Sequence, residues 1–113
     1  MTDQPLQVGG GRKTLGDFAP KLAELTDDVL FTDVWNRAQL PARDRSLITV
    51  AVLTAGGDTD QLRFHLGRAI ENGLTPDELI EAITHVAFYA GWPKAMGAMA
   101  VAKQLFTAPD TNA

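Results

Sequence analysis

The chain has 113 residues, a formal net charge of −4 and no cysteine. Its length suits one compact domain, and the missing thiols exclude thiolate nucleophiles, disulfides and cysteine-bound metals. An acidic chain is also a poor ligand for a phosphate backbone, so nucleic acid is not an expected partner.

The two ends of the chain differ from its centre. Residues 1–13 are polar and include three consecutive glycines, which predicts a flexible N-terminal arm. Residues 108–113 are expected to form a similar tail, leaving 14–107 as a single helical domain. The longest apolar run, Leu47 to Ala55, is far shorter than the roughly 20 residues that cross a bilayer. With no apolar signal segment at the N-terminus, we expect a cytoplasmic protein without a membrane partner.

The first half of the chain shows helical start and stop signals. Asp27 or Asp28 is expected to cap a helix that runs through residues 34–35, and Pro41 opens the next helix. Residues 43–55 are rich in β-branched side chains and would also suit a buried strand. Their length and the glycines that follow favour a helix. Because this helix is apolar nearly all round, it is predicted to be central and surrounded by others.

The second half has clearer signals. A helix over about residues 60–72 is expected to end at Gly73 with a left-handed cap. Thr75 can cap the following helix, Pro76 suits its first position, and Glu78 completes a capping box. That helix should continue to about residue 90, and a last helix should run from 93 to about 106. Apolar residues form 45% of the chain, which is high for a small monomer and predicts a homo-oligomer.

Three segments occur in a fixed order: L-P-A-R-D-R-S-L-I-T-V-A (40–51), Q-L-R-F-H-L-G-R-A-I-E-N-G (61–73) and H-V-A-F-Y-A-G-W-P-K-A (85–95). Together they resemble the carboxymuconolactone decarboxylase family, within the wider group that includes the alkylhydroperoxidase AhpD. The resemblance implies an all-α, AhpD-like bundle of about five to six helices. It also implies assembly into a homo-oligomeric ring, a trimer or a hexamer.

The chain departs from the redox members of that group. Those proteins are similar in carrying Cys-x-x-Cys-x-x-x-His followed by a glycine, and here the histidine and glycine fall on His65 and Gly73. The two cysteine positions hold Asp58 and Gln61, and the proton-relaying glutamate falls near Ser46. Thiol peroxidase chemistry is therefore excluded.

The resemblance points instead to decarboxylation of 4-carboxymuconolactone in aromatic-acid catabolism. Loss of carbon dioxide leaves electron density that is delocalised through the unsaturated lactone and is then protonated at carbon. This chemistry needs an arginine for the retained carboxylate, a hydrogen-bond donor for the lactone oxygen, and an acid. It demands no metal and no organic cofactor.

Three residues are the candidates for these catalytic roles. His65 is the predicted proton donor, because imidazole titrates close to neutral pH. Arg45 is the predicted carboxylate clamp, and Tyr89 is the supporting donor. Each also has a structural alternative: a histidine at the edge of the core, a surface or intersubunit ion pair, and a tyrosine bonded to backbone.

Four further residues are candidates for substrate binding: Arg43, Ser46, Trp92 and His85. For His85 a structural role is preferred, and core packing would explain Trp92 equally well. A metal site using both histidines matches no known ligand spacing.

Two alternative functions keep the same fold. One is an enzyme that acts on another small lactone or a β-keto acid. The other is a non-catalytic oligomeric module that binds a small anionic or aromatic ligand.

Overall fold

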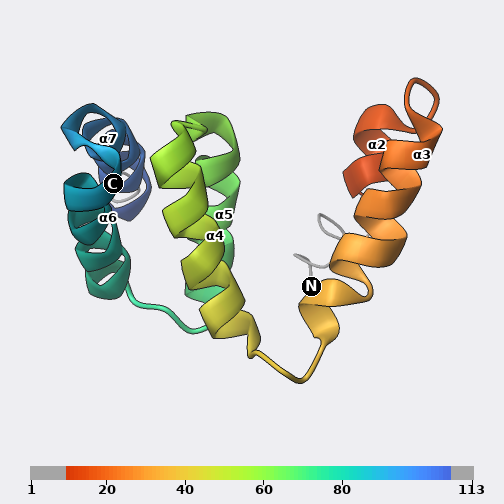
Figure 1. Ribbon diagram of the computed structural model, residues 1–113, viewed down its shortest axis with the longest axis horizontal. Coiled ribbons are helices and arrows are strands. Elements are labelled where there is room, and N and C mark those ends of the chain that lie inside the picture. Colours follow the sequence, from red (N-terminus) through yellow and green to blue (C-terminus); the bar gives the residue numbers. More distant parts are fainter. Residues whose placement is uncertain (1–9, 108–113) are drawn as a thin grey trace. The chain divides into compact units, whose positions relative to one another are not determined.

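The computed structural model describes residues 10–107, which form two compact units, residues 10–42 and 43–107. Each unit is described by itself. Over the described residues the structure contains six α-helices and no strand, which confirms the predicted all-α class (Figure 1). The expected tail at 108–113 and the first nine residues of the expected N-terminal arm lie outside the described residues.

The first unit contains short helices. Helix α2 (Gly10–Leu15) is followed by α3 (Pro20–Glu24), which continues into the π-helix η1 (Leu25–Phe31), and the 3-10 helix η2 (Val34–Asn36) comes last. Helix α2 packs against both α3 and η1. Residues 10–13, which the sequence assigns to a flexible arm, instead form the first part of α2.

Asp27 holds α2 in place. Its side chain is fully buried and accepts hydrogen bonds from the backbone N–H groups of Gly11 (2.8 Å) and Arg12 (3.0 Å). The Arg12 guanidinium also contacts Asp27 at 3.2 Å and bonds to Asp28 at 2.8 Å. The expectation that Asp27 or Asp28 caps the helix through residues 34–35 is therefore wrong. Asp27 satisfies backbone donors in a helix that precedes it in the sequence.

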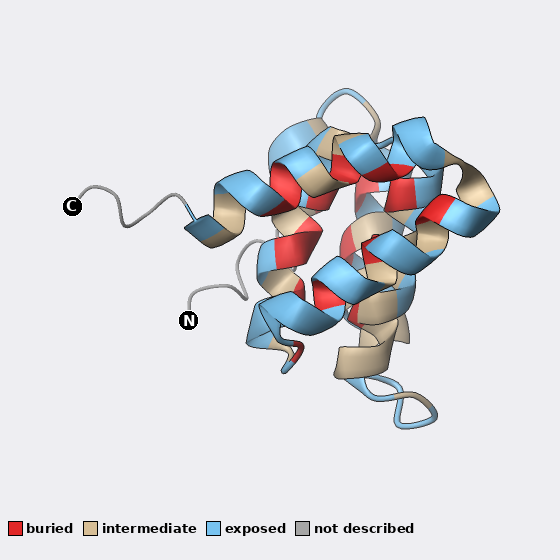
Figure 2. Cartoon of the chain, turned by 90° about the vertical axis from the view of Figure 1, so that its left-hand side faces the viewer, coloured by how far each residue is buried: buried red, intermediate tan, exposed pale blue. Residues whose placement is uncertain are grey.

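The second unit has four longer helices: α4 (Ala42–Gly56), α5 (Thr59–Glu71), α6 (Pro76–Ala90) and α7 (Trp92–Thr107). Helix α7 packs against both α5 and α6. A hydrogen bond from Asn72 Nδ2 to Ser46 Oγ (2.9 Å) joins the C-terminal end of α5 to α4. Figure 2 shows the buried residues as stripes along the helices, with exposed residues on the opposite faces.

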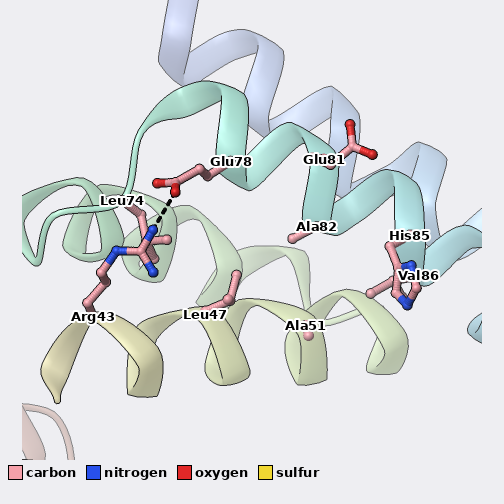
Figure 3. Close-up of a pocket in the computed structure, with 9 residues that line it drawn as sticks. All are labelled: Arg43, Leu47, Ala51, Leu74, Glu78, Glu81, Ala82, His85 and Val86. Carbon is pink, nitrogen blue, oxygen red and sulfur yellow. Dashed lines mark hydrogen bonds and ion pairs between the residues drawn. The ribbon is translucent and has the colours of Figure 1, made fainter.

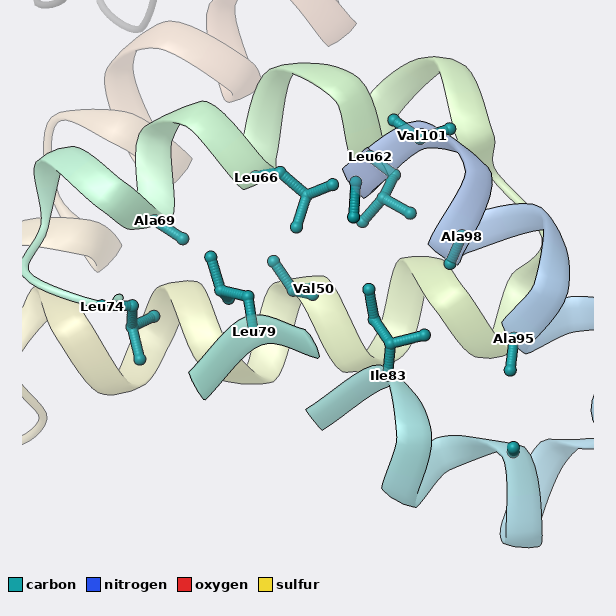
Figure 4. Close-up of a cluster of buried hydrophobic side chains, with 12 residues drawn as sticks. Val50, Leu62, Leu66, Ala69, Leu74, Leu79, Ile83, Ala95, Ala98 and Val101 are labelled. Carbon is teal, nitrogen blue, oxygen red and sulfur yellow. The ribbon is translucent and has the colours of Figure 1, made fainter. Parts of the chain in front are cut away.

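The core of this unit lies among the four helices (Figure 4). Its largest fully buried members come from three of them: Val50 from α4, Leu62 and Leu66 from α5, and Leu79 and Ile83 from α6. Helix α7 contributes mostly small side chains, namely Ala95, Ala98, Val101 and Ala102. Small side chains let α7 approach its neighbours closely.

The predicted signals around residue 74 are confirmed. Gly73 has φ of 107°, and the Leu74 N–H donates to the Ala69 carbonyl at 3.0 Å, as in a glycine-terminated helix. Thr75 and Glu78 form the predicted capping box at the start of α6.

Helix α4 is a helix as predicted, but it is not surrounded on all sides within its unit. Ser46, Val50 and Thr54 form its buried stripe, whereas Ile48 and Val52 are 53% and 62% exposed. The buried Thr54 hydroxyl donates to the Val50 carbonyl at 2.8 Å, which satisfies it inside the core. The outer side of α4 therefore carries apolar surface that the other described residues of its own unit do not cover.

Candidate functional site

A pocket of about 520 Å³ lies in the second unit (Figure 3). This volume is within the usual range for small-molecule sites, roughly 300–1,000 Å³. Its lining comes from α4, from α6 and from the segment between α5 and α6; the residues are Arg43, Leu47, Ala51, Leu74, Glu78, Glu81, Ala82, His85 and Val86.

The sides of the pocket are apolar between its charged residues. Leu47 and Ala51 lie one helical turn apart on α4, and Ala82 and Val86 have the same spacing on α6. Leu74 adds apolar surface near Arg43. Such surroundings lower the local dielectric constant and strengthen the electrostatic effect of the few polar groups present.

One end of the pocket carries an ion pair. Arg43, the second residue of α4, bonds through Nη2 to Glu78 Oε2 in the first turn of α6, and its Nη1 lies 3.5 Å from Asp44. The other carboxylate oxygen of Glu78 accepts the Thr75 backbone N–H at 3.0 Å. The Thr75 N–H and, to a smaller degree, the Arg43 cation lower the pKa of the Glu78 carboxyl below its usual value.

His85 lies at the opposite end of the pocket from the ion pair, seven residues after Glu78 on α6. Its ring is 5.0 Å from the Tyr89 ring, centroid to centroid, with 32° between the planes. Glu81 precedes His85 by one turn, and in Figure 3 its carboxylate is directed away from α4. The pocket thus has a guanidinium at one end, an imidazole at the other and apolar residues between.

The structure brings two of the sequence-predicted residues to this pocket, Arg43 and His85. His65 is elsewhere on α5, where it is 9% exposed and meets Phe64 edge to face at 4.9 Å. Burial, and secondarily the Arg68 cation, lower the pKa of the His65 imidazole. His65 does not line the pocket.

The remaining predicted residues also lie outside the pocket lining. Arg45 is partly buried on α4, and Ser46 is fully buried and hydrogen-bonded to Asn72. Tyr89 is 81% exposed and reaches the site only through its contact with His85. Trp92 is exposed and meets Phe88 edge to face at 5.2 Å.

The two acidic residues of the pocket, Glu78 and Glu81, and its apolar residues are not among the sequence-predicted site residues. Their spacing in the sequence could have indicated them, because positions 78, 81, 82, 85 and 86 recur every three or four residues and so lie on one face of a helix. Glu78 was recognised only as part of a helix cap. Glu78 and His85 lie two turns apart on that face.

Neither a metal centre nor a membrane span is evident in the part of the chain that the structure describes. Residues 10–107 contain no group of three or more histidine, aspartate or glutamate side chains arranged to hold a metal ion. None of the helices in that range is both long enough and apolar enough to cross a bilayer.

Comparison with known proteins identifies the family. Residues 20–104 match the model of the carboxymuconolactone decarboxylase family, a range that reaches into both compact units. The chain is 42% identical to a 4-carboxymuconolactone decarboxylase from Acinetobacter baylyi over 99 residues, which cover 88% of this chain and 74% of that protein. It is 35% identical to a nitrosuccinic acid decarboxylase from Metarhizium robertsii over 81 residues, 72% of this chain and 57% of that protein. The chain therefore belongs to the carboxymuconolactone decarboxylase family.

Proposed function

We propose that the protein is a cofactor-free decarboxylase that acts on 4-carboxymuconolactone or a closely similar small dicarboxylate. The observation that carries this proposal is the pocket, which places one arginine and one histidine at opposite ends of an apolar surface. The similarity to a 4-carboxymuconolactone decarboxylase over 88% of the chain supports the choice of substrate.

Arg43 binds the carboxylate that the product keeps. A guanidinium offers several N–H donors in one plane and suits a carboxylate better than an ammonium group does. Only Nη2 is bonded to Glu78, while Nη1 makes a long contact with Asp44. The guanidinium therefore keeps donor capacity for a bound anion.

The apolar part of the pocket receives the carboxylate that leaves. When the bond from this carboxylate to the ring carbon breaks, carbon dioxide departs and the electron pair stays with the substrate, delocalised into the unsaturated lactone. His85 then delivers a proton to carbon and regains one from water. General acid catalysis of this kind contributes about 10²- to 10⁴-fold to a rate.

This proposal moves two roles to neighbouring candidates. Arg43 takes the clamping role expected of Arg45, and His85 takes the proton-donor role expected of His65, because Arg43 and His85 line the pocket. Tyr89 becomes a residue that packs against the His85 ring and supports its orientation.

The second relative supports a class of substrate. Nitrosuccinic acid, like 4-carboxymuconolactone, has two carboxyl groups and an electron-withdrawing group that can accept the electron pair left by carbon dioxide. A site with one arginine and one proton donor would suit both compounds. Nitrosuccinate is therefore the second substrate to assay.

The test is release of carbon dioxide from 4-carboxymuconolactone by the purified protein. His85→Asn should lower kcat about 10²-fold or more while the protein stays folded, and His65→Asn should lower it much less. If His65→Asn abolishes turnover and His85→Asn does not, the assignment of the proton donor is wrong. A folded wild-type protein that binds the lactone without converting it would favour the non-catalytic ligand-binding module.

We also propose that the protein forms a homo-oligomer, as members of this family are expected to do. Large apolar side chains remain exposed where α6 ends and α7 begins: Phe88 (71%), Trp92 (55%) and Met96 (61%). Together with Ile48 and Val52 on α4, they give the second unit apolar surface that suits contact with another copy.

A further inference from the structure

We propose that Glu78 is a positioning residue, which holds the Arg43 guanidinium at the end of the pocket where it can receive a substrate carboxylate. This inference rests on the proposed function of the pocket. It adds a role for a residue that local sequence signals explain only as part of a helix cap.

The Glu78 carboxylate is itself fixed by the helix cap. Oε1 accepts the Thr75 N–H at 3.0 Å, and the Glu78 N–H donates to Thr75 Oγ1 at 3.1 Å. These reciprocal bonds tie the side chain to the start of α6. The second oxygen, Oε2, then faces Arg43 across the pocket end (Figure 3).

The Arg43 side chain depends on Glu78 to restrict its freedom. It is long and 40% exposed, and its other carboxylate contact, to Asp44, is long at 3.5 Å. An unrestrained arginine at this position would sample many rotamers, each of which must be given up when a ligand binds. A carboxylate already locked by the helix cap restricts that freedom before binding.

The ion pair between Arg43 and Glu78 contributes little to folding stability. Its two side chains are 40% and 44% exposed, and exposed ion pairs contribute only about 0–1 kcal/mol to folding. The pair does join the first turns of α4 and α6 at the end of a pocket. Its larger effect is therefore expected in ligand binding rather than in the free energy of unfolding.

An opposite role for Glu78 makes a distinct prediction. If its negative charge merely repelled a dianionic substrate, removing the charge would tighten binding. If Glu78 positions Arg43, removing its second acceptor oxygen weakens binding instead. The sign of the change in affinity distinguishes the two.

Glu78→Gln is the variant that isolates this effect. Glutamine also completes a capping box, so the bond to Thr75 can persist while the charged contact with Arg43 is lost. Asp77→Asn is the matched control, since it removes one negative charge from the same helical turn at an exposed residue that does not line the pocket. Glu78→Asp keeps the charge but shortens the reach.

The experiment measures KM and kcat with 4-carboxymuconolactone and, separately, calorimetric binding of succinate, an unreactive dicarboxylate. Glu78→Gln should raise KM and the succinate Kd about tenfold, in keeping with the large cost of small misplacements, and leave kcat within about twofold. Asp77→Asn should match the wild type, and Glu78→Asp should lie between.

Unchanged or tighter binding by Glu78→Gln, with a melting temperature near that of the wild type, would overturn the proposal. So would a wild-type protein that does not bind succinate. If the wild type binds succinate but does not decarboxylate the lactone, the proposed function fails. The succinate titrations still decide the role of Glu78 in that case.

Discussion

Gly11 and Asp27 meet in the interior of the first unit, where the Gly11 N–H donates to Asp27 Oδ1 at 2.8 Å. The contact is close because position 11 has no side chain. A Cβ atom there would lie 2.8 Å from the Ala23 carbonyl oxygen and 2.9 Å from Thr26 Cβ. Helix α2 can therefore reach the buried carboxylate only with glycine at this position.

Gly11→Ala should consequently destabilise the protein by about 1–3 kcal/mol, the usual range for overpacking. Gly10→Ala is the matched control, since a Cβ at position 10 would meet no side chain or other helix of the described residues 10–107 within 4 Å. Urea unfolding followed by circular dichroism measures both. Equal midpoints for the two variants would show that α2 does not need this close approach.

Sequence signals predicted the second unit better than the first, for a physical reason. The caps at residues 73–78 depend on neighbouring residues and on glycine or proline geometry, so they can be read locally. Asp27 instead serves Gly11 and Arg12, sixteen and fifteen positions away. The prediction that Asp27 or Asp28 caps the following helix is wrong because an aspartate near a helix start looks the same in sequence whether it caps that helix or an earlier one.

In the candidate site, too, local sequence features could be predicted and contacts between distant segments could not. Arg43 and His85 were recognised by residue type, but which histidine faces a cavity depends on how α4 and α6 pack. His65 sits in a segment that strongly resembles a family motif, yet on its helix it is buried beside Leu62 and Leu66. Residue type and spacing place a side chain on a helical face, and tertiary packing decides whether that face borders a pocket.

Replacing Arg43 tests the carboxylate clamp. Arg43→Met should lower kcat/KM about 10- to 100-fold, since a hydrogen bond to a charged group is worth about 1.5–3 kcal/mol. Arg45→Met tests the residue that the sequence predicts as the clamp. Arg63→Met is the control for loss of one positive charge outside the pocket. Steady-state kinetics with the lactone supplies the measurement. A larger loss in Arg45→Met than in Arg43→Met, with both proteins folded, would return the clamp to Arg45.

His65 predicts a dependence of stability on pH. Its pKa is lowered in the folded protein, so below the ordinary histidine value of about 6.5 the unfolded chain binds more protons than the folded one. The stability present above that pH is thus lost as the pH falls through the folded pKa. Urea unfolding at pH 7.5 and 5.5 should show this loss in the wild type and a smaller one in His65→Gln. Equal losses in the two proteins would mean that other groups cause the dependence.

The exposed aromatic residues lead to a prediction about assembly. Phe88 is 71% exposed and contacts Trp92, so it is part of the exposed apolar surface where α6 ends and α7 begins. If another copy covers this surface, Phe88→Glu buries an unpaired charge at the contact. Loss of a well-packed anchor residue of an interface costs about 2 kcal/mol or more. Light scattering should then report a smaller particle for Phe88→Glu than for the wild type.

Gln61→Glu, which adds the same charge at an exposed position on α5, should leave the mass unchanged. An oligomer that survives Phe88→Glu would place the subunit contact on another surface, with the exposed Ile48 and Val52 of α4 the next to test.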